Sequence, residues 1–201
     1  MISVWKIQNS KRRFIIVMDT ENITIALRRH QSEALLIALR NFLTLRLKKE
    51  RIDRKELIAF FGLHPEKKKL YLKRLLRRLG FNVRIIRLRP PYYAEQIDHR
   101  LLSFLHSLAR KRNDKVITNI ILIASDNDYA NALAEMVRKS WTNNIGRIIV
   151  LSRANSSKLR KWSSEFWKIT IKRTNQIISV DQEDFKVISV NGYTIVFERL
   201  K

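Results

Sequence analysis

Short apolar runs alternate with longer segments of helical period along most of this 201-residue chain. Strands that alternate with helices are typical of an α/β fold with a mostly parallel sheet. We therefore expect such a sheet at the centre of the protein. The apolar runs predict strands at residues 14–18, 57–61, 83–88, 119–124 and 147–151.

Four segments between these runs have the spacing of amphipathic helices. The clearest begins at Pro65, carries its leucines on one face, and is followed by Gly80 where a C-cap glycine belongs. A proline pair, Pro90-Pro91, interrupts the chain before the third helix. The predicted helices span residues 31–49, 65–79, 97–112 and 129–139.

The last part of the chain predicts β-structure. A sixth short strand is expected at residues 167–171. Beyond it, two strand-like runs at 185–190 and 193–197 flank Asn191-Gly192, which is a strong hairpin signal. We expect one domain over residues 1–173 and a C-terminal β-hairpin appendage over residues 174–201.

Positive charge dominates the composition, with 41 Lys and Arg against 18 Asp and Glu and a formal net charge of +23. Such an excess favours a polyanionic partner, nucleic acid first and an anionic membrane surface second. The hydrophobic fraction of 45% can build a core, which excludes a disordered basic tail. Four Gly are too few for a glycine-rich phosphate loop.

Two absences narrow the class of protein further. The chain has no Cys, which excludes disulfides and thiolate sites and favours a reducing compartment. No apolar run near its start is long enough to cross a bilayer or to act as a signal sequence. We therefore expect a soluble, cytoplasmic protein without a membrane partner.

The chain has only eight Asp, so their positions are informative. Asp19 directly follows the first apolar run, and Asp126 and Asp128 follow the fourth. Ligand sites in open α/β sheets form at the carboxyl ends of strands, so these acids converge if the two strands are neighbours. Asp98 shares a predicted helical face with two leucines, which turns its carboxylate towards the sheet.

Four acids at one edge of a sheet would repel one another and have raised pKa values unless a cation neutralises them. Mg²⁺ and Mn²⁺ prefer oxygen ligands such as carboxylates, water and phosphate. The cluster therefore indicates a metal site for phosphodiester chemistry. Asp98 and Asp128 have an alternative role as helix N-caps, whereas the segment after Asp19 makes a poor generic cap.

Three segments resemble the motifs of NYN domains, a branch of the PIN-like nucleases. They are residues 14–22 (Phe-Ile-Ile-Val-Met-Asp-Thr-Glu-Asn), residues 97–98 at a helix start, and residues 121–129 (Ile-Leu-Ile-Ala-Ser-Asp-Asn-Asp-Tyr). Residues 59–62 and 80–83 are similar to the family's second strand and to its entry to the third. The resemblance covers roughly residues 13 to 170.

This resemblance implies a PIN-like three-layer fold, with a mostly parallel sheet of strand order 3-2-1-4-5. It also implies metal-dependent ribonuclease activity with Mg²⁺ or Mn²⁺ as the cofactor. Asn22 matches the family's Asn, which positions the first acidic loop, and counts as a catalytic candidate. The implied catalytic and metal-binding acids are Asp19, Asp98, Asp126 and Asp128.

Two positions depart from the family pattern. Ala124-Ser125 stand where the family commonly has Ser-Gly. Glu95 and Gln96 precede the second motif, where the family commonly has a Lys just before the Asp. These departures bear on substrate handling more than on metal binding.

Basic and aromatic residues form three candidate nucleic-acid-binding clusters. Lys and Arg can track phosphates, and exposed aromatic rings can stack on unpaired bases. A solvated helix face and core packing are the alternative interpretations. The candidates are Lys68, Lys69, Lys73, Arg77, Arg87, Arg89, Tyr92, Tyr93, Arg153, Lys158 and Lys161.

Together these features predict a divalent-metal-dependent nuclease that hydrolyses phosphodiester bonds, with RNA as the expected substrate. The alternative is a non-catalytic nucleic-acid-binding or regulatory protein that retains the same fold. A third interpretation makes the C-terminal hairpin a homodimerisation or docking module, because an exposed hairpin edge can pair with another chain.

Overall fold

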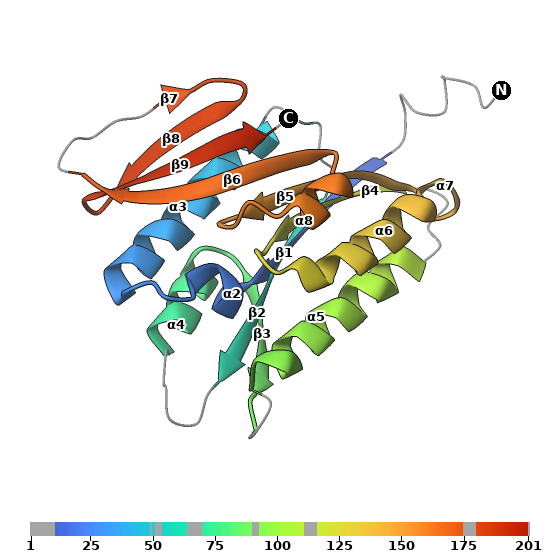
Figure 1. The fold of residues 1–201 in the computed structure, drawn as a ribbon, viewed down its shortest axis with the longest axis horizontal. Coiled ribbons are helices and arrows are strands. Elements are labelled where there is room, and N and C mark those ends of the chain that lie inside the picture. Colours follow the sequence, from blue (N-terminus) through green and yellow to red (C-terminus); the bar gives the residue numbers. More distant parts are fainter. Residues whose placement is uncertain are drawn as a thin grey trace.

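A nine-stranded sheet forms the centre of the computed structural model (Figure 1), which describes residues 11–48, 50, 54–63, 70–89, 93–110, 116–174 and 180–200. Its strand order is β3-β2-β1-β4-β5-β6-β9-β8-β7. Strands β1 to β6 run parallel, and β7, β8 and β9 add antiparallel pairs. The strands are β1 Lys11–Asp19, β2 Arg54–Leu63, β3 Asn82–Arg87, β4 Val116–Ile123, β5 Ile145–Ser152, β6 Glu165–Arg173, β7 Val180–Asp181, β8 Phe185–Val190 and β9 Tyr193–Leu200.

Helices cover both faces of this sheet. Helices α3 and α4 pack on one face, and α5, α6 and α8 pack on the other. None of the described helices is both long enough and apolar enough to cross a lipid bilayer. The helices are α2 Thr20–Thr24, α3 Arg29–Lys48, α4 Leu70–Arg78, α5 Tyr93–Arg110, α6 Ala130–Arg138, α7 Ser140–Asn143 and α8 Ser157–Lys161, with a 3₁₀ turn η1 at Asn127–Tyr129.

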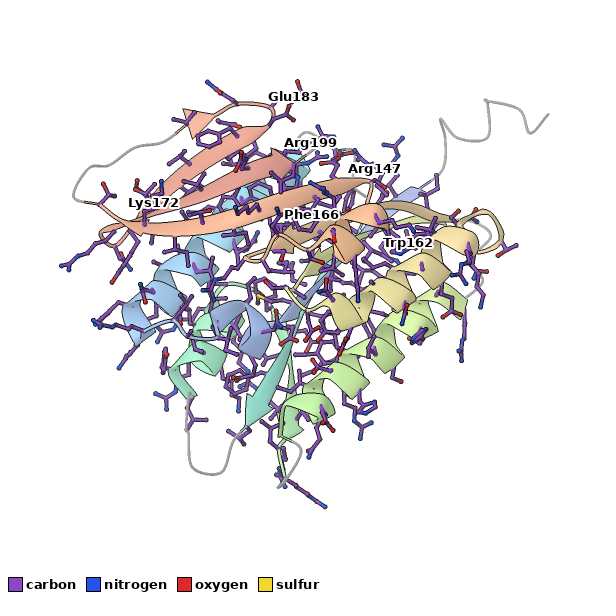
Figure 2. The ribbon with its side chains drawn as sticks, viewed as in Figure 1. Arg147, Trp162, Phe166, Lys172, Glu183 and Arg199 are labelled. Atoms are coloured by element: carbon purple, nitrogen blue, oxygen red, sulfur yellow. The ribbon has the colours of Figure 1, made fainter. Side chains whose placement is uncertain are left out.

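The side chains of β1 show why its apolar run is unbroken. Phe14, Ile16 and Met18 belong to the core beneath α3 and α4, whereas Ile15 and Val17 belong to the core beneath α5 and α6. Successive side chains of a strand point to opposite faces, so a central strand covered on both sides needs apolar residues at every position. Side chains fill both helix–sheet interfaces (Figure 2). The predicted α/β class with a mostly parallel sheet is confirmed.

The predicted C-terminal hairpin is also confirmed, and it extends the same sheet. Strand β9 pairs with β6 along its whole length, and Phe197 stacks on Phe42 of α3 with 4.4 Å between ring centroids. Asn191 and Gly192 have φ values of 49° and 76°, the positive values that a tight Asn-Gly turn requires. The boundary predicted between residues 173 and 174 therefore falls within one continuous sheet.

The predicted helices agree with the structure in position but differ at their ends. The start predicted at Pro65 lies outside the described residues, and α4 is described from Leu70. Helix α5 begins at Tyr93 rather than residue 97, because a proline restricts the residue before it and not those that follow. The short helices α2, α7 and α8 were not predicted, since periodicity needs a longer segment to be recognised.

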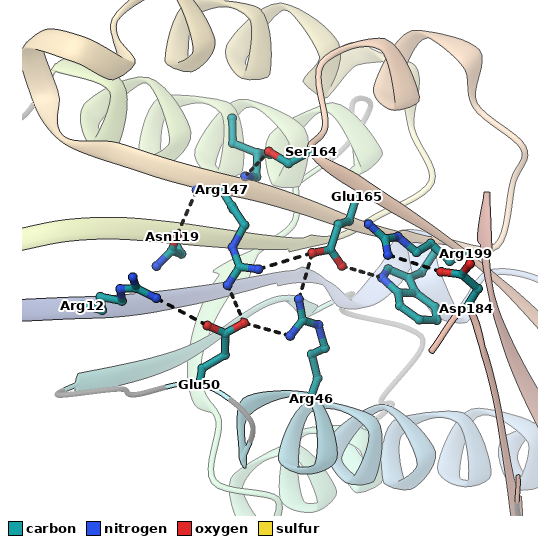
Figure 3. Close-up of polar contacts among 11 residues, drawn as sticks. Arg12, Arg46, Glu50, Asn119, Arg147, Ser164, Glu165, Asp184 and Arg199 are labelled. Carbon is teal, nitrogen blue, oxygen red and sulfur yellow. Dashed lines mark hydrogen bonds and ion pairs between the residues drawn. The ribbon is translucent and has the colours of Figure 1, made fainter. Parts of the chain in front are cut away.

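A network of ion pairs ties the end of α3 to the starts of β5 and β6 (Figure 3). Arg46 donates to Glu50 at 2.9 Å and to Glu165 at 2.8 Å, and Arg147 also contacts both carboxylates. Burial raises the pKa of Glu50, but hydrogen bonds from Arg147 and Arg46 outweigh it and hold this pKa below its usual range. The network lies at the amino ends of parallel strands, opposite the edge that the acidic motifs follow.

Candidate functional site

Asp19 is the last residue of β1, at the carboxyl end of the parallel strands. Its neighbours in the sheet are β2 and β4, so the end of β2 and the segment after β4 flank it. The side chain is 1% exposed, and Oδ1 accepts a hydrogen bond from the backbone N of Asn22 at 3.0 Å. This bond makes Asp19 the N-cap of α2. The expectation that Asp19 is not a cap is therefore wrong, because α2 is too short to recognise from sequence.

Asp98 lies in the second turn of α5, so it is not the N-cap of this helix. The preceding residue, Ile97, is buried against the end of β2. A Cβ atom at Gly62 would lie 2.6 Å from Ile97 Cδ1 and 2.8 Å from Leu88 Cδ1, closer than side chains tolerate. Glycine at this position thus lets α5 approach β2 and bring Asp98 to the same edge of the sheet.

A tyrosine that is not among the predicted site residues joins these two acids. Tyr129 is fully buried, and its hydroxyl lies 2.5 Å from Asp19 Oδ2 and 2.7 Å from Asp98 Oδ1. A phenol carries one proton, so it can donate to only one of the two carboxyl groups at a time. The other carboxyl group must carry its own proton or face a cation. The signal in the sequence was an aromatic residue directly after the acidic pair, at the start of an amphipathic helix.

The electrostatics of this cluster favour protonation. The pKa of Asp19 is raised to about 6, chiefly by burial and also by the charge of Asp98, although hydrogen bonds from Tyr129 and Asn22 lower it. Burial also raises the pKa of Asp98, as do the charges of Asp126 and Asp128. Burial and the charge of Asp19 raise the pKa of Tyr129 far above its usual range, so its hydroxyl stays a donor. Near neutral pH, full ionisation of both acids is therefore costly without a cation.

Asp126 and Asp128 lie in the loop after β4. Asp126 Oδ1 accepts a hydrogen bond from the backbone N of Asp128 at 3.0 Å and caps η1, so the cap role suggested for Asp128 belongs to Asp126. Both raise the pKa of Asp98, yet in the described part of the chain no three His, Cys, Asp or Glu side chains are arranged to hold a metal ion. The four predicted ligands thus lie as two pairs at one edge rather than as a closed ligand set.

Asn22 ties the acidic loops together. Its Oδ1 accepts a hydrogen bond from the backbone N of Ser125 at 2.6 Å. Ser125 Oγ accepts one from the backbone N of Arg153 at 2.9 Å. The Arg153 guanidinium donates to the carbonyl oxygens of Ile23 and Ile25 at 3.0 and 2.7 Å. Arg153, a predicted nucleic-acid contact, therefore holds the end of α2 against the loop after β5.

The other predicted nucleic-acid contacts are spread over the molecule. Helix α4 lies on one face of the sheet, and α5 and α8 lie on the other, so the candidates do not share one surface. Lys68, Lys69 and Tyr92 lie outside the described residues. The remaining candidates are Lys73 and Arg77 on α4, Arg87 and Arg89 at the end of β3, Tyr93 at the start of α5, and Lys158 and Lys161 on α8.

Replacing Tyr129 with Phe is expected to leave the two carboxyl groups without their shared donor. The hydrogen bond from Tyr129 lowers the pKa of Asp19, so in Tyr129→Phe this pKa should rise above about 6. Loss of a buried partner costs about 1–3 kcal/mol, and we expect that decrease in unfolding free energy at pH 7. The decrease should be smaller at acidic pH, where the carboxyl groups are protonated and no longer repel each other.

Carboxyl NMR titration and urea denaturation measure both effects. Tyr193→Phe on β9 is the matched control, which should leave the pKa of Asp19 unchanged. If Asp19 titrates identically in Tyr129→Phe and in the unaltered protein, the bridge between the two acids does not exist in solution.

No protein-family model and no curated protein matches the chain. Among solved structures it is similar to VPA0982 of Vibrio parahaemolyticus, a protein of unknown function, with a TM-score of 0.54 and 16% identity over 79% of this chain and 93% of that one. A structure of FlhF complexed with GMPPNP and Mg²⁺ aligns with a TM-score of 0.28 and 11% identity over 79% of this chain and 66% of that one, too distant to support an argument. At its level of identity, the likeness to the Vibrio protein extends to the α/β fold alone.

Proposed function

We propose that this chain is a divalent-metal-dependent nuclease that hydrolyses phosphodiester bonds in RNA. The observation that carries the proposal is the pair formed by buried Asp19 and half-buried Asp98, which share the hydroxyl of Tyr129. When both carboxyl groups are ionised, this pair needs a positive charge that the described residues do not supply at hydrogen-bond distance. A divalent cation supplies that charge and can also bind a phosphodiester.

The residues at this edge suit Mg²⁺ or Mn²⁺ because their donors are all oxygen atoms. Asp19 and Asp98 would hold the ion, with Asp126 and Asp128 as the further acids of the same edge. Bound there, the ion would activate a water for attack on phosphorus and neutralise charge on the leaving oxygen. Tyr129 contacts both carboxyl groups, and its buried position keeps bulk water from that side of the site.

The proposal includes membership of the PIN-like nucleases, in the NYN branch. Its support is the three resembling motifs, together with a sheet in which β3, β2, β1, β4 and β5 follow one another. That order sets the ends of β1 and β4 side by side, where two of the motifs end. The net charge of +23 supports a nucleic-acid partner, and RNA rests on the resemblance.

Cleavage of a labelled single-stranded RNA in the presence of Mn²⁺ tests this proposal. We expect cleavage that a chelator stops and that falls by about 100-fold or more in Asp19→Asn and in Asp126→Asn, since metal stabilisation of the transition state is worth several kcal/mol. Glu198→Gln, which alters an exposed carboxylate on β9, should cleave normally.

Two outcomes would contradict the proposal in different ways. Cleavage that survives both Asp substitutions would place the reaction elsewhere. Salt-sensitive RNA binding that a chelator leaves unchanged, without cleavage under any divalent metal, would identify a non-catalytic nucleic-acid-binding protein.

A further inference from the structure

A groove of about 840 Å³ runs between β3, the edge strand of the sheet, and helix α5. Arg84 and Arg87 of β3, Arg89 just beyond it, and Arg100 of α5 line the groove. Among the described residues that line it there is no Asp or Glu. The groove is therefore a concave surface with a high density of positive charge.

These four arginines differ from the arginines of the ion-pair network. None of the four forms an ion pair with a described carboxylate, whereas Arg46 binds both Glu50 and Glu165. Arginines that lack carboxylate partners keep their donors for an external anion. Repulsion among them also makes an anionic occupant favourable.

Arg84 is held in place by aromatic rings. Its guanidinium lies 4.4 Å from the ring centroid of Phe104 and 5.5 Å from that of Phe60. Stacking on a ring face leaves the N–H groups of a guanidinium free at its edge and reduces the entropy that it loses on binding phosphate. Arg84 is exposed, so the plane of its guanidinium can itself stack on an unpaired base.

The groove reaches the candidate site along α5. Gln96 and His99, on either side of Asp98 in the sequence, both line it. The Gln96 side chain bonds to the backbone N and O of Arg89 at 3.2 and 2.8 Å, which fixes the segment after β3 against α5. From Gln96 to Ser107, both lining residues, α5 rises about 16 Å. That length suits several consecutive phosphates rather than one small anion.

We infer that this groove binds the phosphate backbone of a single-stranded nucleic acid and directs it towards Asp98. The groove follows one strand and one helix, and stacking on the Arg84 guanidinium requires unpaired bases, so a single strand fits it better than a duplex. Only the second part of this inference, that the bound strand leads to Asp98 as the site of cleavage, rests on the proposed function. Binding in the groove does not require cleavage.

Fluorescence anisotropy with a labelled oligonucleotide of about ten uridines, in the presence of a chelator, tests the inference. In the double variant Arg87→Glu/Arg100→Glu we expect affinity to fall by about tenfold or more. The slope of log affinity against log salt should become less steep by about 1.4, because two phosphate contacts are lost at about 0.7 each. Arg87→Ala/Arg100→Ala should weaken binding in the same direction by a smaller factor.

The matched control is Lys172→Glu/Arg173→Glu, which makes the same change in net charge at the exposed end of β6 (Figure 2). It should bind within about threefold of the unaltered protein, since distant exposed charges are screened at physiological salt. An equal loss in the groove and control variants would overturn the inference, because overall charge would then explain binding. A duplex bound as tightly as the single strand, or anionic vesicles bound in preference to it, would also overturn it.

The same variants separate this inference from the proposed function. If binding depends on the groove arginines but the protein cleaves nothing, the groove is a nucleic-acid-binding site and the proposed nuclease activity is contradicted. The opposite result is cleavage that depends on Asp19 but keeps its full rate and affinity in Arg87→Glu/Arg100→Glu. It would support the nuclease activity and overturn the inference that the groove binds nucleic acid.

Discussion

Asp19→Asn is expected to raise the unfolding free energy at pH 7 by about 3 kcal/mol when divalent metal is absent. Burial raises the pKa of Asp19 from 3.8 to about 6 in the folded protein, so ionisation at neutral pH costs folding free energy. A neutral amide avoids that cost. The sign follows from the direction of the shift, because a carboxyl group with a raised pKa contributes most to stability below its unfolded pKa. The gain should therefore be full above about pH 6 and vanish near pH 3.8.

Hydrogen bonding at the site points in the same direction. The amide oxygen of the variant can keep the bond from the backbone N of Asn22, which Asp19 Oδ1 accepts at 3.0 Å. Its amide nitrogen can donate to the oxygen of Tyr129. The phenol proton is then free for Asp98, which lies 2.7 Å away. Three groups that compete for one proton in the unaltered protein would each have a partner.

Urea denaturation in a chelator between about pH 4 and pH 8 measures the gain. Glu198→Gln should show no comparable pH-dependent gain, since this carboxylate is exposed on β9. Adding Mn²⁺ should stabilise the unaltered protein, by about 2.7 kcal/mol at one hundred times the dissociation constant, and should stabilise Asp19→Asn much less. If Asp19→Asn is less stable than the unaltered protein at pH 7 in chelator, ionisation of Asp19 does not cost folding free energy and the prediction is wrong.

The central sheet was predictable because its physical requirement is local. The parts of strands that helices cover on both faces need an apolar residue at each position, and β1 and β4 meet that requirement with unbroken runs at residues 14–18 and 120–123. The carboxyl end of each run then fixes where the following residues lie. For this reason Asp19 and Asp126 could be assigned to one edge of the sheet from sequence alone.

Contacts between distant residues were not predictable in the same way. Tyr129 and Asp19 are 110 positions apart, and their contact depends on the packing of α6 and η1 against the ends of β1 and β4. Arg46 and Glu165 are 119 positions apart. Composition indicated an excess of Arg and Lys, but it could not separate arginines that carboxylates neutralise from those of the groove. Which arginines have carboxylate partners depends on how α3, β5 and β6 pack together, and which line the groove depends on β3 and α5.

Glu165→Ala is expected to lower the unfolding free energy at pH 7 by about 3 kcal/mol. Glu165 Oε1 accepts a hydrogen bond from Arg46 at 2.8 Å and lies 3.6 Å from Arg147, and Oε2 accepts one from Trp167 Nε1 at 3.3 Å. The Trp167 ring is buried, so its N–H group would lose its partner. Arg46, whose side chain is 16% exposed, would keep only Glu50 as a counter-charge. For a chain of this size the melting temperature should fall by about 6–12 °C.

A matched control and a double-mutant cycle show whether this loss belongs to the ion pairs of the network. Glu183→Ala removes an exposed carboxylate that lines the same pocket as Glu165 and should change stability by less than about 0.5 kcal/mol. Arg46→Ala combined with Glu165→Ala should cost less than the two single losses together, because each single variant leaves a partner unpaired. A loss in Glu165→Ala no larger than in Glu183→Ala would contradict the prediction. It would mean that the desolvation of these charges cancels their attraction, so that the network joins α3 to β5 and β6 without stabilising the fold.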